Sequence, residues 1–363
     1  MIDWNPIAEK FREADAILIG ASNGLSITEG LHLFADNAAF ERLFGDFKRK
    51  YGLGCILQGM MAGWPSEEEK WAFWARLVHH YCGQYQPTPV MNNLKAIVGE
   101  KDYFVVTSNG EGHFELCGFD PSKIYEIEGN WFTMQCARPC HDTIYPSLAV
   151  AEKLSAAEQS GHVPTELVPR CPKCGGPMDI HMGAGQRMIP DTAAQARFQN
   201  FLKTYHGKKL VVLELGIGWR NQLIKAPMMR LVASEPNATY VTRNLGEIYI
   251  TDNIKEKSFG LDGRLDELLA ALREAHRLFG DAQGAQQLLR QAADGGPVAF
   301  QVLGELHPGR VEGGTAEVLG RCGGLPVHVA ALLLEAFFGV VGHVELVAAV
   351  VAVAQAFVQV YGE

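Results

Sequence analysis

The chain has 363 residues, enough for one large domain or two ordinary ones. Hydrophobic residues make up 47% and charged residues 20%, which is typical of a globular protein and excludes a disordered one. The net charge of -9 argues against nucleic-acid binding, because nucleic-acid binders usually present a basic face.

The first twenty residues contain no basic segment followed by an apolar run, so they do not resemble a signal peptide. We therefore expect a cytoplasmic protein. In that compartment cysteines stay reduced, and closely spaced pairs of cysteines are more often metal ligands than disulfides.

Four apolar segments, each ended by small polar residues, predict buried strands of a parallel sheet. These segments are residues 16–20, 102–109, 208–218 and 238–246. Helical patterns fall between them, at residues 66–82, 88–100 and 191–206. This alternation predicts an α/β fold, a Rossmann-like doubly wound parallel sheet that binds ligands at the carboxyl ends of its strands.

The first predicted strand runs into a glycine-rich loop, "GASNGLSITEG". Gly20, Gly24 and Gly30 leave room for a pyrophosphate to approach the backbone. The spacing departs from G-x-G-x-x-G, so the loop alone is weak evidence for dinucleotide binding.

Four cysteines occur as two close pairs, "CARPC" and "CPKC". They are Cys136, Cys140, Cys171 and Cys174. Two such pairs present four thiolates to one tetrahedral ion, the geometry that Zn²⁺ prefers, and they leave no open position for chemistry. The pattern predicts a structural zinc site in a smaller inserted domain at about residues 130–185. The alternative is four reduced cysteines without a metal.

These features, in this order, resemble the sirtuin family, and most closely its class M branch. Six segments carry the resemblance: "GASNGLSITEGL", "EEEKWAFWARL", "KDYFVVTSN", "GFDPSKIYEIEGNW", "QCARPCH" and "ELGIGWRNQLIKAPMMRL". The resemblance covers roughly residues 1–255. It implies a sirtuin-like NAD-binding catalytic domain over residues 1–260 that includes the zinc module.

The resemblance implies an enzyme that breaks the nicotinamide–ribose bond of NAD⁺, which is then a co-substrate. Class M sirtuins resemble protein ADP-ribosyltransferases, so we expect transfer of ADP-ribose to a protein acceptor, and a lipoyl-carrier protein is the partner that the resemblance suggests. Other sirtuins remove acyl groups from lysine, so NAD⁺-dependent deacylation is an alternative. A degenerate NAD⁺-binding pseudoenzyme or sensor is another, because Ser22, Asn23, Ala35 and Glu111 depart from the family pattern.

The resemblance also implies which residues contact NAD⁺. They are Gly20, Ala21, Gly24, Leu25, Ser26, Phe34, Ser108, Asn109, Glu111, Gly216, Ile217, Gly218 and Asn244. Asn109 would orient the nicotinamide ribose and the leaving group, although an Asn at a strand end also fits a turn. Glu111 replaces the Asp that contacts the carboxamide of nicotinamide. Phe34 would shield the ribose after nicotinamide leaves, and a core Phe is the other interpretation.

Glu128 occupies a position of particular interest. Counting back from Cys136, it falls where sirtuins keep a catalytic His and where class M members keep Gln. A carboxylate there could stabilise the oxocarbenium ion that develops on the ribose, or act as a general base if burial raised its pKa. The alternative is a loop carboxylate that faces solvent.

Residues 261–363 form a C-terminal extension rich in Ala, Val and Gly. Beyond Lys257 the chain contains no Lys, Asn, Ile, Met or Trp. This composition fits two origins, a native accessory segment and a shifted reading frame. The apolar, charge-free segment at residues 346–361 is shorter than the roughly 20 residues that a spanning helix needs, so we do not expect a membrane protein.

Overall fold

The structure, a computed structural model, describes residues 4–183, 187–246, 248–275 and 277. The residues up to Arg273 form one compact unit. Most of the C-terminal extension, from residue 278 on, lies outside the described residues. None of the helices in the described ranges has the length and apolar character needed to cross a membrane.

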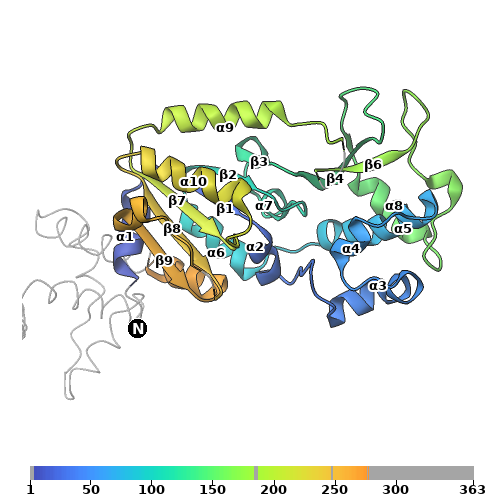
Figure 1. Ribbon diagram of the computed structural model, residues 1–363, viewed down its shortest axis with the longest axis horizontal. Helices are drawn as coiled ribbons and strands as arrows, with labels where there is room; N and C mark the ends of the chain where they lie inside the picture. Colours follow the sequence, from blue (N-terminus) through green and yellow to red (C-terminus); the bar gives the residue numbers. More distant parts are fainter. Residues whose placement is uncertain (1–3, 184–186, 247, 276, 278–363) are drawn as a thin grey trace, which may run out of the picture. The chain divides into compact units, whose positions relative to one another are not determined.

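A six-stranded parallel sheet forms the centre of this unit (Figure 1). Its strands are β1 (Ala16–Ala21), β2 (Asp102–Thr107), β3 (Ile124–Glu126), β7 (Leu210–Leu215), β8 (Thr239–Asn244) and β9 (Ser258–Asp262). They lie in the order β3-β2-β1-β7-β8-β9, and each neighbouring pair is parallel. This is the Rossmann order, with its switch point between β1 and β7. The predicted doubly wound sheet is therefore confirmed.

Helices cover both faces of the sheet. For this reason β1 and β7 are buried along their whole length. On one face lie α9 (Thr192–Thr204) and α10 (Gln222–Ser234), and Phe201 and Met228 from these helices join a core with Leu18 and Val212. Figure 1 shows α6 (Pro89–Val98) on the opposite face.

Shorter helices near this sheet include α1 (Asn5–Glu13), α2 (Asn23–Thr28), α7 (His113–Leu116) and the 3-10 helices Pro121–Lys123 and Asp252–Lys257. A further helical segment, residues 265–275, follows β9. After β9, the buried leucines Leu265, Leu268, Leu269 and Leu272 extend the compact unit past residue 260.

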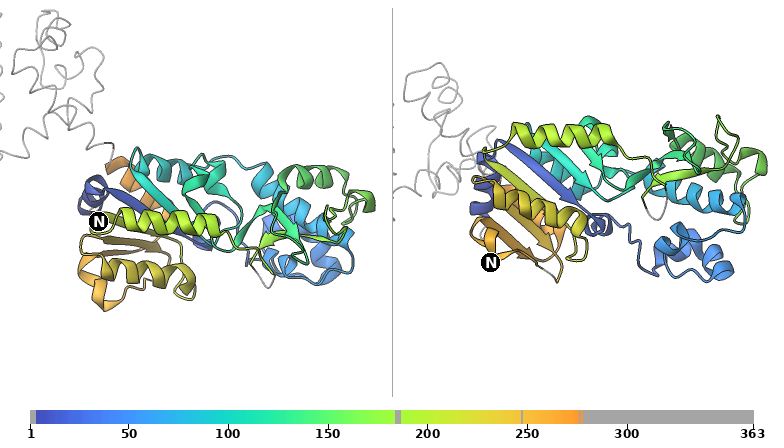
Figure 2. Two further views of the ribbon diagram at one scale, coloured as in Figure 1. Left: turned by 90° about the horizontal axis from the view of Figure 1, so that it is seen from above. Right: turned by 45° about the horizontal axis from the view of Figure 1, so that its top comes forward.

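A second hydrophobic core lies within the cysteine-rich module and the helices around it. Its three-stranded antiparallel sheet has the order β5-β4-β6, with β4 (Gly129–Cys136), β5 (Tyr145–Pro146) and β6 (Met178–Met182). The helices around it are α3 (Ala38–Tyr51), α4 (Ile56–Met60), α5 (Glu67–Val78), the π-helix His79–Gly83, α8 (Leu148–Ala157) and the 3-10 helix Thr165–Leu167. Figure 2 shows these helices gathered around β4 and β6. The core therefore draws on two separate stretches, residues 31–82 and 131–180.

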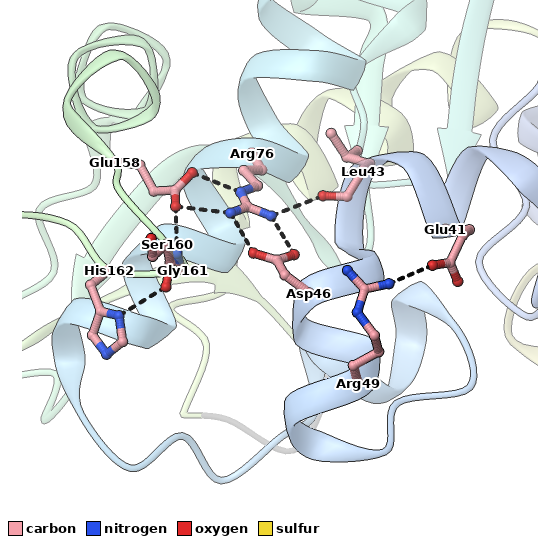
Figure 3. A network of polar contacts seen from close by, with 9 residues as sticks. All are labelled: Glu41, Leu43, Asp46, Arg49, Arg76, Glu158, Ser160, Gly161 and His162. Carbon is pink, nitrogen blue, oxygen red and sulfur yellow. Dashed lines mark hydrogen bonds and ion pairs between the residues drawn. The ribbon is translucent and has the colours of Figure 1, made fainter.

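Arg76 connects the helices of this second core (Figure 3). From α5, its guanidinium donates to both carboxylate oxygens of Asp46 at 2.7 and 2.8 Å and to both of Glu158 at 2.8 Å. It also donates to the carbonyl oxygen of Leu43 at 3.1 Å. Burial opposes its charge, but the two carboxylates outweigh this effect and raise the pKa of Arg76. One side chain thus joins α3, α5 and the end of α8.

Several observed elements are shorter than the predicted ones, whereas β1 extends one residue beyond its prediction. The predicted strand at residues 208–218 ends at Leu215, because Gly216 takes a φ of +63° and turns the chain. The predicted helix at residues 66–82 changes to a π-helix at His79. The strands β3 and β9 were not predicted, since the three residues of β3 and the mixed residues of β9 carry little apolar pattern.

Two glycines determine how closely the loops after β1 and β7 approach. The backbone N–H of Gly24 donates to the carbonyl oxygen of Gly216 at 2.9 Å. A Cβ on Gly24 would lie 2.5 Å from the Cα of Gly216, and a Cβ on Gly216 would be as close to Gly24. Only glycine fits at both positions without moving backbone.

We expect Gly24→Ala to lower the free energy of unfolding by about 1–3 kcal/mol, the usual cost of overpacking, because backbone must shift to admit the methyl group. The matched control is Gly218→Ala in the same loop cluster, where an added Cβ meets nothing within 4 Å. That control should change the free energy by less than about 1 kcal/mol. Denaturant unfolding of both variants measures this, and equal effects would contradict the close approach.

Candidate active site

The candidate site lies where the carboxyl ends of β1, β2 and β7 meet. In the sheet, Ala21 at the end of β1 pairs with Thr107 of β2 on one side and with Leu215 of β7 on the other. Ligands of doubly wound sheets bind in the crevice at this switch point. The structure brings together nine predicted residues on the three loops that follow: Gly24, Leu25, Ser26, Ser108, Asn109, Glu111, Gly216, Ile217 and Gly218.

The four other predicted contacts are placed differently. Gly20 and Ala21 lie within β1, where an added Cβ on Gly20 would meet the sulfur of Met228 at 2.3 Å. Asn244 ends β8, one strand beyond β7. The side chain of Phe34 is 51% exposed, so it is not a core residue.

Leu25 and Ile217 are buried at 2% and 0% exposure. Their side chains therefore pack inside the protein. Leu25 and Ile217 can therefore contact a ligand at the switch point only through their backbone atoms.

A small polar cluster joins the three loops. Ser108 Oγ donates to Ser22 Oγ at 3.0 Å, and Asn221 Nδ2 donates to Ser22 Oγ at 2.9 Å and to Ser108 Oγ at 3.3 Å. Asn221 also caps α10, because its Oδ1 accepts from the N–H of Leu223. The sequence analysis missed Asn221, although an Asn directly before an apolar helical segment is a usual helix-start signal.

Asn109 has an unusual environment. The side chain is 4% exposed, and its backbone N–H donates to Thr107 Oγ1 at 3.0 Å. Neither Oδ1 nor Nδ2 has a hydrogen-bond partner among the residues that the structure describes. A buried amide without partners costs about 1–3 kcal/mol, so this group is suited to pair with a ligand.

Glu111 is buried beside Asn109 at 3% exposure. Ser26 Oγ donates to its Oε1 at 2.6 Å. Burial raises the pKa of Glu111, and the charge of His113 and the Ser26 hydrogen bond act against this rise. The carboxyl group is therefore held in place by the first loop while its ionisation depends on the neighbouring cation.

Glu128 lies in the turn between β3 and β4 and is exposed. Partial desolvation raises the pKa of its carboxyl group. In the sheet, Glu126 at the end of β3 pairs with Thr107 at the end of β2. Glu128 and Asn109 each lie two residues beyond this pair. Both residues therefore project from the same edge of the sheet.

Glu126 is a second carboxyl group near this edge that the sequence analysis did not select. Burial raises its pKa to about 8, and the negative charges of Glu115, Glu111 and Asp191 add to the rise. Asn130 Nδ2 donates to its Oε2 at 2.6 Å. The signal in the sequence was only one acidic residue at the end of a very short strand.

The four predicted cysteines come together in the second module. Their sulfur atoms all lie within 4.8 Å of one another. Cys136 and Cys174 are 3.7 Å apart at sulfur, and Cys140 and Cys171 are 3.6 Å apart. Burial opposes ionisation of Cys171, but backbone N–H groups of the "CPKC" turn donate to its sulfur and lower its pKa to about 6. Such a cluster could hold a metal ion.

His141 lies at the edge of this cluster. Its Nδ1 is 3.0 Å from the sulfur of Cys140, while its Nε2 is hydrogen-bonded to Tyr145 at 2.8 Å. The four sulfurs already complete a set of tetrahedral ligands, so His141 is a neighbour of the cluster.

Two known proteins are similar in sequence to more than half of this chain. A protein named "Protein ADP-ribosyltransferase" from Staphylococcus aureus (strain Mu50) is 32% identical over 270 residues, which are 72% of this chain and 84% of that protein. A "Probable bifunctional ADP-ribose hydrolase/ADP-ribosyltransferase" from Fusarium oxysporum f. sp. cubense is 28% identical over 228 residues. These cover 58% of this chain and 36% of the fungal protein.

No protein-family model matches the chain. A solved structure titled "The Structural basis for Sirtuin Substrate affinity" aligns with 75% of this chain and 98% of its own, at a TM-score of 0.45 and 15% identity. This distant likeness adds nothing to the match with the S. aureus protein. On the strength of that match, the chain belongs to the same family as the S. aureus protein ADP-ribosyltransferase.

Proposed function

We propose that the protein transfers ADP-ribose from NAD⁺ to a protein acceptor and releases nicotinamide. The observation that carries this proposal is the buried amide of Asn109, which has no partner among the described residues and lies at the switch point of a Rossmann-type sheet. The names of both relatives support the same activity.

In this proposal NAD⁺ lies across the loops that follow β1, β2 and β7. The close approach of Gly24 and Gly216 leaves backbone available to the phosphates and the adenosine ribose. The amide of Asn109 can both donate and accept, which suits the hydroxyls of the nicotinamide ribose. Glu111 is proposed to contact the carboxamide of nicotinamide.

The reaction develops positive charge on the ribose as the bond to nicotinamide breaks. We propose that the carboxylate of Glu128 stabilises this charge, in the position where class M sirtuins keep Gln. Glu128 is exposed and its pKa is raised, so the group can also take up the proton that an acceptor releases. Phe34 and Asn244 are proposed contacts to the ribose and to the adenosine end.

The four-cysteine cluster is proposed to hold a structural Zn²⁺. Four thiolates about 2.3 Å from a tetrahedral ion have sulfurs about 3.8 Å apart, and the observed sulfur–sulfur distances of 3.6 and 3.7 Å fit this value. The ion would stabilise β4, β6 and their turns and would take no part in the transfer, since the cysteines leave no open position.

We propose a lipoyl-carrier protein as the first acceptor to test and the cytoplasm as the location. The catalytic domain is proposed to include the zinc module at about residues 130–185. Its boundary with the C-terminal extension is proposed to lie near Arg273, where the compact unit ends.

Incubation with NAD⁺ labelled in the adenosine half tests the function. We expect release of nicotinamide and transfer of the label to a protein, and Glu128→Ala should lower the rate about 10²–10³-fold, as loss of a charge-stabilising group does. The matched control is Glu152→Ala, which removes an exposed carboxylate on α8. It should retain the wild-type rate.

The outcomes separate the alternatives. An acyl-lysine peptide that loses its acyl group while no protein becomes labelled would favour deacylation over ADP-ribosyl transfer. Binding of NAD⁺ without turnover would favour a pseudoenzyme. An unchanged rate for Glu128→Ala would remove the role given to that residue and leave the transfer itself standing.

Metal analysis tests the proposed zinc site. The purified protein should contain about one zinc ion per chain, the stoichiometry of a four-thiolate site, and Cys171→Ser should lose most of it. Cys55→Ser is the matched control, because Cys55 is a buried cysteine outside the cluster. A wild-type protein that folds with far less than one zinc per chain would contradict the proposal.

A further inference from the structure

A buried ion pair connects the end of β7 to the first turn of α10. Lys225 Nζ donates to Glu214 Oε1 at 2.5 Å, and the two side chains are 3% and 0% exposed. Thr242 Oγ1 donates to the same oxygen at 2.8 Å, and the hydroxyl of Tyr240 donates to Oε2 at 2.5 Å. Both oxygens of the carboxylate therefore have partners inside the protein.

Stability alone gives no reason for this ion pair. The core around it is apolar and contains Leu18, Val212 and Met228. Taking two charges out of water costs free energy that their attraction often fails to recover, and apolar residues in place of a buried ion pair are often neutral or stabilising. The pair differs from apolar packing in its directional contacts, because they hold the two backbones in one arrangement.

The ion pair bridges the loop between β7 and α10, which is the third loop of the candidate site. Glu214 is the second-last residue of β7, and Lys225 lies about one helical turn after Asn221, the N-cap of α10. Pro227 lies inside the helix and has no backbone N–H, so no hydrogen bond forms to the carbonyl oxygen of Leu223. The ion pair therefore holds the first turn of α10 by a contact that the helix backbone does not supply.

Asn221 contacts the other two loops. Its Nδ2 donates to Ser22 Oγ in the first loop at 2.9 Å and to Ser108 Oγ in the second loop at 3.3 Å. Ser108 directly precedes Asn109, whose buried amide has no partner among the described residues. One side-chain amide thus joins all three loops next to the group proposed to contact NAD⁺.

We propose that Asn221, Glu214 and Lys225 are positioning residues, which hold the three loops in the arrangement that receives NAD⁺. The proposal rests on the function proposed above. The ion pair fixes the first turn of α10, and this turn places Asn221 against Ser22 and Ser108. Without these contacts the loops have to become ordered when NAD⁺ binds, and that ordering lowers the affinity.

Isothermal titration of NAD⁺ into Asn221→Ser tests the contact between the loops. Serine is as good an N-cap as asparagine, so the free energy of unfolding should stay close to that of the wild type. Serine lacks the amide that donates to Ser22 and Ser108, so the affinity for NAD⁺ should fall about tenfold, within the range usual for residues that do not touch the ligand. In nicotinamide release, KM should rise by a similar factor while kcat stays within about threefold.

Asn37→Ser is the matched control. Asn37 is the N-cap of α3 in the second core, where its Oδ1 accepts from the N–H of Phe40 at 2.9 Å. The same exchange there keeps a helix cap and alters none of the three loops. The affinity of this variant for NAD⁺ should equal that of the wild type.

The ion pair is tested by Lys225→Met and by the double variant Glu214→Gln/Lys225→Met. The single variant leaves a buried carboxylate without its cation and should lower the free energy of unfolding, whereas the double variant leaves no unpaired buried charge and should recover stability. Both should bind NAD⁺ about tenfold more weakly than the wild type, because neither has the directional contact. A double variant that regains affinity together with stability would overturn the positioning role of the pair.

Amide hydrogen exchange of the free protein gives a readout that does not depend on NAD⁺. Exchange in residues 216–221 should be faster in the double variant than in the wild type, while β7 and the rest of α10 stay protected. If the charge variants fold poorly, Asn221→Ser decides the matter alone. A wild type that does not bind NAD⁺ removes the proposed function, and the exchange measurement still tests how the loop is held. If the wild type binds NAD⁺ and Asn221→Ser binds it equally well, only the positioning role is overturned.

Discussion

The rest of the site depends on one close contact, the approach of the backbones of Gly24 and Gly216 at the switch point. β1 lies between β2 and β7 in the parallel sheet, so the loops after these three strands all begin at the same edge. The contact between the two glycines draws the first and third loops together. The cluster of Ser22, Ser108 and Asn221 then attaches the second loop.

Several buried polar groups near the switch point lack hydrogen-bond partners or a compensating charge in the free protein. The amide of Asn109 lacks partners among the described residues, and Glu111 and Glu126 are carboxyl groups whose pKa values burial raises. Such groups lower the stability of the folded chain unless a ligand pairs with them, and this trade is typical of functional sites. The stable parts lie elsewhere, in the two hydrophobic cores and in the Arg76 contacts.

The sequence was sufficient to predict the sheet and the loops of the site. Long β-branched runs predicted β1, β2, β7 and β8, and the paired cysteines predicted the cluster that the structure assembles. Other features depend on tertiary contacts that no local pattern carries. The short β3 forms only because it pairs with β2, and Asn221 contacts Ser22 and Ser108, which lie 199 and 113 positions away in the chain.

In the proposed function, NAD⁺ binds at the loops of the switch point and the buried amide of Asn109 takes part. Isothermal titration of NAD⁺ into the wild type and into Asn109→Ala measures this contribution. We expect the wild type to bind and the variant to bind at least about tenfold more weakly, the effect of roughly 1.4 kcal/mol of lost hydrogen bonding. Equal affinities for the two proteins, or a wild type that does not bind NAD⁺, would contradict it.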